Sequence, residues 1–209
     1  MEPDFYVTAF VTLFVVIDPI GTTPIFMALT QGMPRARRRA VGIRACLLAM
    51  TILFLFGLLG EELLGFVGIS MPAFRIAGGI LLFLTAIEML FGLRTKRRQD
   101  QSDADDTEPG DDPSVFPLAI PLLSGPGGIA SIILLNEQSG GDIWVQAGIF
   151  SVMIGIFAIV FVLFLAAGII EKALGETGIL VVTRLLGMLL AGLSVQFVLT
   201  GLANFGIAN

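Results

Sequence analysis

The sequence contains no histidine and a single cysteine, Cys46. Without histidine, a Ser-His-Asp triad, a His-ligated metal and a His-bound haem are excluded. One cysteine alone cannot form a disulfide framework, a Cys-X-X-Cys redox pair or a thiolate zinc site. A Gly-X-X-X-X-Gly-Lys-Ser/Thr motif is also missing, which argues against an ATP-driven pump. We therefore expect no enzyme activity, no metal and no cofactor.

Apolar residues, by contrast, are abundant: they make up 56% of the 209 residues, and the mean hydropathy is +0.93. This composition is typical of a polytopic membrane protein. Residues 1–4 lack the basic region of a cleavable signal peptide, so we expect the first apolar run to be retained. The sequence predicts an all-α membrane protein of one domain, 1–209. Its six transmembrane helices are expected at roughly 5–29, 40–60, 68–93, 115–135, 143–170 and 179–205.

The basic residues predict how the spans are oriented. They cluster in the loops after the first and third spans, whereas the second and fourth loops have none. Of the twelve Lys and Arg residues, only Arg75 lies towards the other side. The positive-inside rule therefore places both termini outside the cytoplasmic membrane. The loop 94–114 is then cytoplasmic, and we expect its acidic tract, 100–112, to be a solvated segment.

The chain divides into two halves of three helices, which we place at 1–93 and 115–209. Arg75-Ile-Ala-Gly78 matches Arg184-Leu-Leu-Gly187 at an offset of 109, and a proline-glycine motif recurs near that offset. Because each half has an odd number of helices, the halves have opposite orientation. This is the inverted-repeat plan of many secondary transporters.

The recurring motif lies at the centre of the first and fourth spans. In Ile17-Asp18-Pro19-Ile20-Gly21-Thr22-Thr23-Pro24, both prolines lack an amide hydrogen and are expected to interrupt the helix. Asp18 is costly near the bilayer centre unless it faces protein or water. The fourth span carries a similar break centred on Gly125. We therefore predict that helices 1 and 4 are broken near the midplane, the position of the substrate in many transporters.

After each break a new half-helix starts, and its first amides carry the positive end of the helix dipole. Such an end binds a carboxylate, while Asp18 could receive an ammonium group or a proton. Hydroxyl groups nearby, including that of Ser131, add further donors and acceptors. This combination fits a small zwitterion. The predicted binding residues are Asp18, Pro19, Gly21, Thr22, Thr23, Ser124, Gly125, Pro126, Gly127 and Gly128. The alternative is that the prolines only kink the helices and Asp18 only caps the second half-helix.

We assign Arg75 and Arg184 a structural role at the membrane interface.

Two motifs carry a resemblance to a known family. Residues 17–26 resemble the first-helix signature of the MarC family of bacterial and archaeal inner-membrane proteins. Pro121-Leu-Leu-Ser-Gly-Pro-Gly resembles its fourth-helix signature. The resemblance implies membership of the LysE-like transporter group and a binding site at 18–24 and 124–128. Members called SnatA are described as transporters of small neutral amino acids, glycine and alanine. The long acidic loop departs from the compact family pattern.

These observations together favour a secondary transporter of small neutral amino acids that works by alternating access. The proton is the favoured coupling ion, because Asp18 is titratable and no cluster of carboxylates offers a sodium site. The alternative is an amino-acid or drug efflux protein, or a channel, of the LysE-like group. The expected partners are the amino acid and the lipid bilayer. We expect no binding of nucleic acid, and the sequence does not decide whether the protein forms a homo-oligomer.

Overall fold

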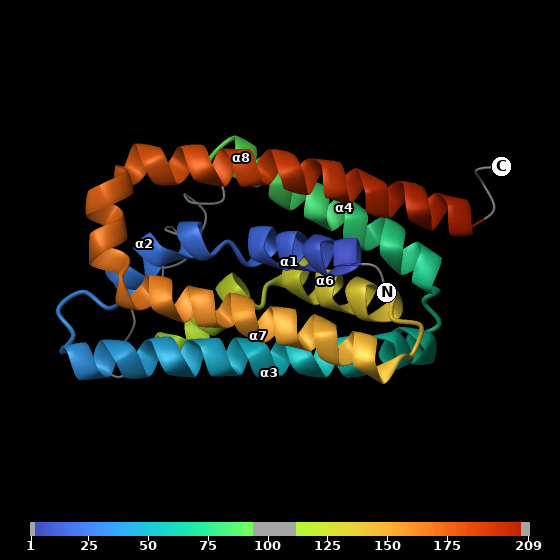
Figure 1. The fold of residues 1–209 in the computed structure, drawn as a ribbon, viewed down its shortest axis with the longest axis horizontal. Helices are drawn as coiled ribbons and strands as arrows, with labels where there is room; N and C mark the ends of the chain where they lie inside the picture. The colour runs from blue at the N-terminus through green and yellow to red at the C-terminus, as the bar shows by residue number, and fades with distance from the viewer. Residues whose placement is uncertain (1–2, 94–111, 206–209) are drawn as a thin grey trace.

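The computed structural model describes residues 3–93 and 112–205, and within these ranges every regular element is helical. Figure 1 shows the helices packed lengthwise into one elongated bundle. The elements are α1 (Pro3–Ile17), α2 (Pro19–Leu29), α3 (Arg35–Val67), α4 (Met71–Leu90), η1 (Ser114–Leu123), α6 (Pro126–Glu137), α7 (Ile143–Leu165) and α8 (Ala167–Asn204). The predicted all-α fold is confirmed. Most of the charged loop, including residues 100–111 of its acidic tract, lies outside the described residues.

The described residues contain five helical segments that are long and apolar enough to cross a membrane. They are Asp4–Leu29, Arg35–Val67, Met71–Leu90, Ile143–Leu165 and Thr177–Asn204. The pair η1 and α6, bent by 55° at its break, supplies a sixth if it is counted as one span. The number and order of these segments agree with the sequence prediction of six spans.

The boundaries differ from the prediction at the junction of α7 and α8. The fifth span ends at Leu165 rather than at residue 170. Residues 167–174 instead form the first part of α8, which crosses the end of the bundle before the chain turns into the last span (Figure 1). The turn occurs at Gly175, whose φ of 61° is readily adopted only without a Cβ. Hydropathy could not show that the fifth span ends at Leu165, because residues 166–170, Ala-Ala-Gly-Ile-Ile, are also apolar.

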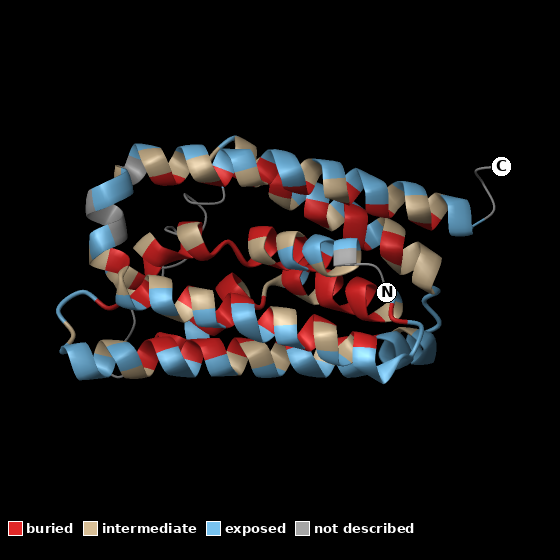
Figure 2. Cartoon of the chain, viewed as in Figure 1, coloured by how far each residue is buried: buried red, intermediate tan, exposed pale blue. Residues whose placement is uncertain are grey.

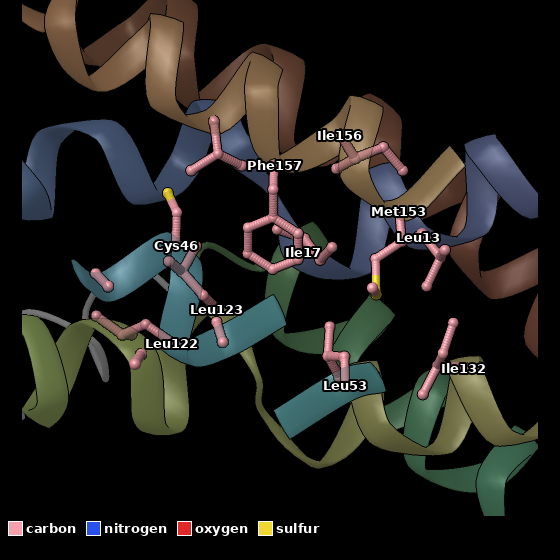
Figure 3. Close-up of a cluster of buried hydrophobic side chains, with 14 of the residues drawn as sticks. Leu13, Ile17, Cys46, Leu53, Leu122, Leu123, Ile132, Met153, Ile156 and Phe157 are labelled. Atoms are coloured by element: carbon pink, nitrogen blue, oxygen red, sulfur yellow. The ribbon is translucent and has the colours of Figure 1, made fainter. Parts of the chain in front are cut away.

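The two broken spans lie in the interior of the bundle. In the first span 67% of the most apolar window is buried, against 28–39% for the four unbroken spans. Figure 2 shows the same concentration of buried residues on α2 and α6. Side chains from four elements meet there, with Leu13, Leu53, Ile132 and Phe157 in one buried cluster (Figure 3). Irregular backbone is thereby kept inside protein, as the hydrocarbon phase requires.

Helices α4 and α8 form an antiparallel pair along one side of the bundle. Glycines allow their backbones to approach closely: a Cβ at Gly79 would lie 2.8 Å from the Ser194 carbonyl oxygen. A Cβ at Gly187 would lie 3.2 Å from the Ala86 carbonyl oxygen. The two contacts are related by an offset of 108 residues, which takes Gly79 to Gly187 and Ala86 to Ser194; it is one less than the offset of the Arg-Gly match. Each helix thus presents the same kind of small-residue face to the other.

The two ends of the bundle differ in charge. The arginine-rich start of α3 lies at the same end as the turn between α7 and α8, whereas the start of α1 and the end of α8 lie at the other end (Figure 1). This is the separation that the basic loops predict. Which end faces the cytoplasm stays a prediction from the positive-inside rule.

Candidate functional site

The first break occurs at a single residue, Asp18. Helix α1 ends at Ile17, Asp18 adopts the left-handed conformation (φ 55°, ψ 63°), and α2 starts at Pro19. Asp is one of the few residues that tolerate this conformation, because its short polar side chain can hydrogen-bond locally. The Gly21 amide donates to Asp18 Oδ1 at 3.1 Å, and Asp18 is only 1% exposed. Asp18 is therefore the N-cap of α2, and Pro19 occupies the N1 position where no amide is needed.

Gly21 is required by this cap. A Cβ at position 21 would lie 2.3 Å from Asp18 Oδ2 and 2.8 Å from Asp18 Cγ. No side chain fits there while the carboxylate keeps its position. The absence of a side chain at Gly21, a residue predicted to bind substrate, thus has a local structural explanation.

The two threonines that follow are bonded within the same turn. Thr22 Oγ1 donates to the Asp18 carbonyl oxygen at 2.8 Å, and Thr23 Oγ1 donates to the Pro19 carbonyl oxygen at 2.7 Å. The prediction that Pro24 also interrupts the helix is wrong, since α2 continues to Leu29. A proline at this position removes one helical hydrogen bond, and the bonds on either side maintain the helix.

The second break is longer than the sequence suggested. Segment η1 contains extended backbone at Phe116 and Ile120, because each residue precedes a proline whose ring disfavours the helical conformation. Ser124 Oγ donates to the carbonyl oxygen of Ala119 at 2.8 Å. Gly125 is extended (φ −67°, ψ 170°), and α6 starts directly after it. The predicted break at Gly125 is confirmed, and the irregular stretch extends back to residue 116.

The start of α6 differs from the start of α2 because no side chain caps it. The Ile129 amide donates the first backbone hydrogen bond at the start of this helix, to the Gly125 carbonyl oxygen at 3.1 Å. Among the residues that the structure describes, none accepts a hydrogen bond from the amides of Gly127 or Gly128. Both glycines are buried. Two donors therefore lie unused at the positive end of the α6 dipole.

The two breaks lie against each other. A Cβ at Gly127 would be 3.2 Å from Val16 Cγ1, two residues before Asp18, and 3.7 Å from Thr85 Oγ1 on α4. Helices α1 and α6 run antiparallel through the bundle (Figure 1). The structure thus brings the uncapped start of α6 next to the end of α1. Thr85, which the site prediction did not include, belongs to the same neighbourhood.

Two further hydroxyls belong to this α1–α6 interface. Thr12 lies one turn before Val16, and Ser131 lies one turn after Gly127, so both are on the faces that the Val16–Gly127 contact joins. Both residues are 0% exposed, and neither hydroxyl has a hydrogen-bond partner among the described residues. The sequence analysis did not include Thr12 among the candidate site residues. Its position four residues before Val16, and therefore on the same face of α1, is the sequence signal that could have identified it.

Comparison with known proteins assigns the chain to a family. A family model described as MarC family integral membrane protein matches residues 3–205. The chain belongs to the MarC family. It is 36% identical to the UPF0056 membrane protein of Archaeoglobus fulgidus over 96% of this chain and 93% of that protein. It is 31% identical to the UPF0056 inner membrane protein YhgN of Escherichia coli over 94% of this chain and 95% of that protein. No solved structure matches.

In this MarC-family chain, Arg75, which the sequence assigns a structural role at the membrane interface, has its side chain buried in protein. Its side chain is 7% exposed and forms an ion pair with Glu137, the last residue of α6, whose side chain is 23% exposed. The pair ties α4 to the far end of the uncapped helix. It also neutralises the one arginine that departs from the charge pattern of the loops. Local sequence cannot predict it, because the partners are 62 residues apart.

A second ion pair joins the start of η1 to α3. Arg44 Nη1 lies 2.7 Å from Asp112 Oδ2, on the surface. Partial burial raises the pKa of Asp112, but hydrogen bonds with Ser114 and Arg44 and the Arg44 charge outweigh this, so the pKa lies below its ordinary value of 3.8. Asp112, which the sequence analysis placed in the solvated acidic tract, is therefore a structural part of the fold.

Proposed function

We propose that the protein is a secondary transporter that carries small neutral amino acids, glycine or alanine, across the cytoplasmic membrane by alternating access. The observation that carries the proposal is the pair of buried amides of Gly127 and Gly128, which have no acceptor among the described residues. A carboxylate bound there would accept both donors and face the positive end of the α6 dipole. Neither residue has a side chain of its own that would cover its amide.

Asp18 is the partner proposed for the substrate ammonium group. It lies two residues from Val16, the residue that packs on Gly127. An ionised carboxylate has about four acceptor sites, so capping Gly21 with one oxygen is compatible with a second role. The hydroxyls of Thr12 and Ser131 could complete a polar lining between α1 and α6. A proton carried by Asp18 would couple transport to the pH gradient.

Alternating access requires a two-part scaffold around this site. The contacts of α4 with α8 recur at an offset of 108 residues, and the breaks recur in the first and fourth spans. Both recurrences support an inverted repeat of 1–93 and 115–209, the plan on which such transporters rock about a central site. The interior position of both broken spans is consistent with this arrangement.

Uptake by proteoliposomes tests the function. The purified protein should take up labelled glycine and alanine, and exchange them for internal substrate, while leucine and arginine are poorly transported. Uptake of none of these amino acids above protein-free liposomes would contradict the substrate class. Conductance without saturation or exchange would instead indicate a channel of the LysE-like group.

A matched pair of variants tests the site. Gly127→Ala places a methyl group 3.2 Å from Val16 Cγ1 and beside the unused amides, so glycine uptake should fall tenfold or more. Gly155→Ala is the control, because its Cβ would meet nothing within 4 Å. Equal activity of the two variants at equal protein levels would exclude a backbone site at Gly127.

A further inference from the structure

A second polar site lies at the arginine-rich end of the bundle, away from the paired breaks. There, a cavity of about 540 Å³ opens between α2, the start of α3 and the turn from α7 to α8. Three of its ten lining residues are arginines, Arg35, Arg38 and Arg39, and none of these described lining residues is acidic. The cavity therefore concentrates positive charge without a counter-charge of its own.

Arg38 is the best-placed donor in this cavity. Its guanidinium lies over the ring of Phe26, 5.2 Å from the centroid, and Phe26 stacks on Phe164 at 4.1 Å. The Nη2 atom of Arg38 is buried and has no hydrogen-bond partner among the described residues. A buried guanidinium N–H without an acceptor is costly, so a bound anion would be strongly favoured. The aromatic pair holds the guanidinium in place.

The start of α3 adds to the positive potential. The helix begins at Arg35, and its N-cap, Pro34, makes no side-chain hydrogen bond to the first amides. Those amides and the helix dipole favour negative charge at the same end of the helix as the arginines.

The rim of the cavity is amphipathic. Arg35 and Arg39 are exposed on one side. On the other side Leu165 and Ile169 are 56% and 73% exposed, although both are large and apolar. A free phosphate would use only the arginine side. An ordered lipid has a phosphate next to acyl chains, and it matches both sides.

We infer that this cavity binds the phosphate of an anionic phospholipid headgroup, with Arg38 as the central donor and an acyl chain along Leu165 and Ile169. Basic pockets between membrane helices are suited to such headgroups. The site is separate from the paired breaks, so it does not depend on the proposed transport function.

Lipid binding to the delipidated full-length protein in detergent, followed by native mass spectrometry, tests the inference. Phosphatidylglycerol should bind at least tenfold more tightly than phosphatidylcholine, and excess inorganic phosphate should not displace it. Arg38→Gln should weaken phosphatidylglycerol binding at least fivefold, which corresponds to about 1 kcal/mol for one lost arginine contact. Arg37→Gln is the matched control: Arg37 is exposed on the same turn and does not line the cavity, so the change should stay within twofold.

Three results would overturn the inference. An equal loss of phosphatidylglycerol affinity in Arg37→Gln and Arg38→Gln would indicate that the lipid is attracted by the general positive charge of the surface and not by this cavity. Displacement by inorganic phosphate would indicate a site for a free anion, and equal binding of phosphatidylcholine would exclude recognition of the headgroup charge. If Arg38→Gln melts early because the ring contact is lost, Arg39→Gln provides the same test from an exposed position.

Discussion

Replacing Asp18 by asparagine or alanine should separate its structural role from its role in transport. Asparagine retains an oxygen that can accept from the Gly21 amide, now 3.1 Å from Asp18 Oδ1, and it tolerates the left-handed backbone. The free energy of unfolding should therefore change by less than about 0.5 kcal/mol. Alanine loses the cap, about 1 kcal/mol, and adds a left-handed strain of about 1 kcal/mol. We expect Asp18→Ala to be less stable by about 2 kcal/mol.

Transport should be strongly impaired by Asp18→Asn, although this substitution should hardly change the stability of the fold. Asp18→Asn removes the negative charge and the titration while the fold remains, so glycine affinity should fall tenfold or more, about 1.4 kcal/mol. The pH dependence of uptake should disappear in the same variant. Glycine affinity, uptake at several pH values and the melting temperature would be measured on one preparation. Asp142→Asn is the control, because Asp142 caps α7 in the same way, with the Trp144 amide donating to its Oδ1 at 2.8 Å.

Two results would refute this reasoning. Normal transport with normal pH dependence in Asp18→Asn would reduce the site to the α6 amides and the hydroxyls. A melting temperature of Asp18→Asn as low as that of Asp18→Ala would show that the carboxylate stabilises the fold through more than the cap.

Three further predictions concern the rest of the chain. Glu137→Gln should lower the free energy of unfolding by about 2 kcal/mol, because it leaves the buried Arg75 without a counter-charge. Adding Arg75→Met should recover part of this loss, and unfolding in mixed detergent measures both changes. Deletion of residues 100–111 should leave uptake unchanged, and lost uptake by folded protein would reveal a role for the acidic tract. A cysteine at Gly140 should react with an impermeant reagent outside intact cells and one at Thr107 should not, whereas the reverse labelling would reject the orientation.

The sequence could predict much of the first break and less of the second. Asp18, Pro19 and Gly21 form a cap within four residues, so local chemistry is sufficient to place it. The extended backbone at Phe116 and Ile120 also follows from the prolines after them, yet the break was expected only at Gly125. At Pro24 the error was the opposite, because a break was expected where the helix continues. A proline removes one helical hydrogen bond, but the helix is interrupted only if the hydrogen bonds on either side are also lost.

The sequence by itself determined the all-helical class, the number and approximate positions of the spans, and the positions of breaks at Asp18 and Gly125. Hydropathy, proline and glycine act over a few residues, and insertion into a bilayer depends on such local properties. Only the tertiary structure decided which faces meet. It places Gly127 on Val16, pairs Arg75 with Glu137, and sets Arg38 over the stacked Phe26 and Phe164. These partners are far apart along the chain, and nothing in a local pattern specifies how two helices rotate about their axes when they pack.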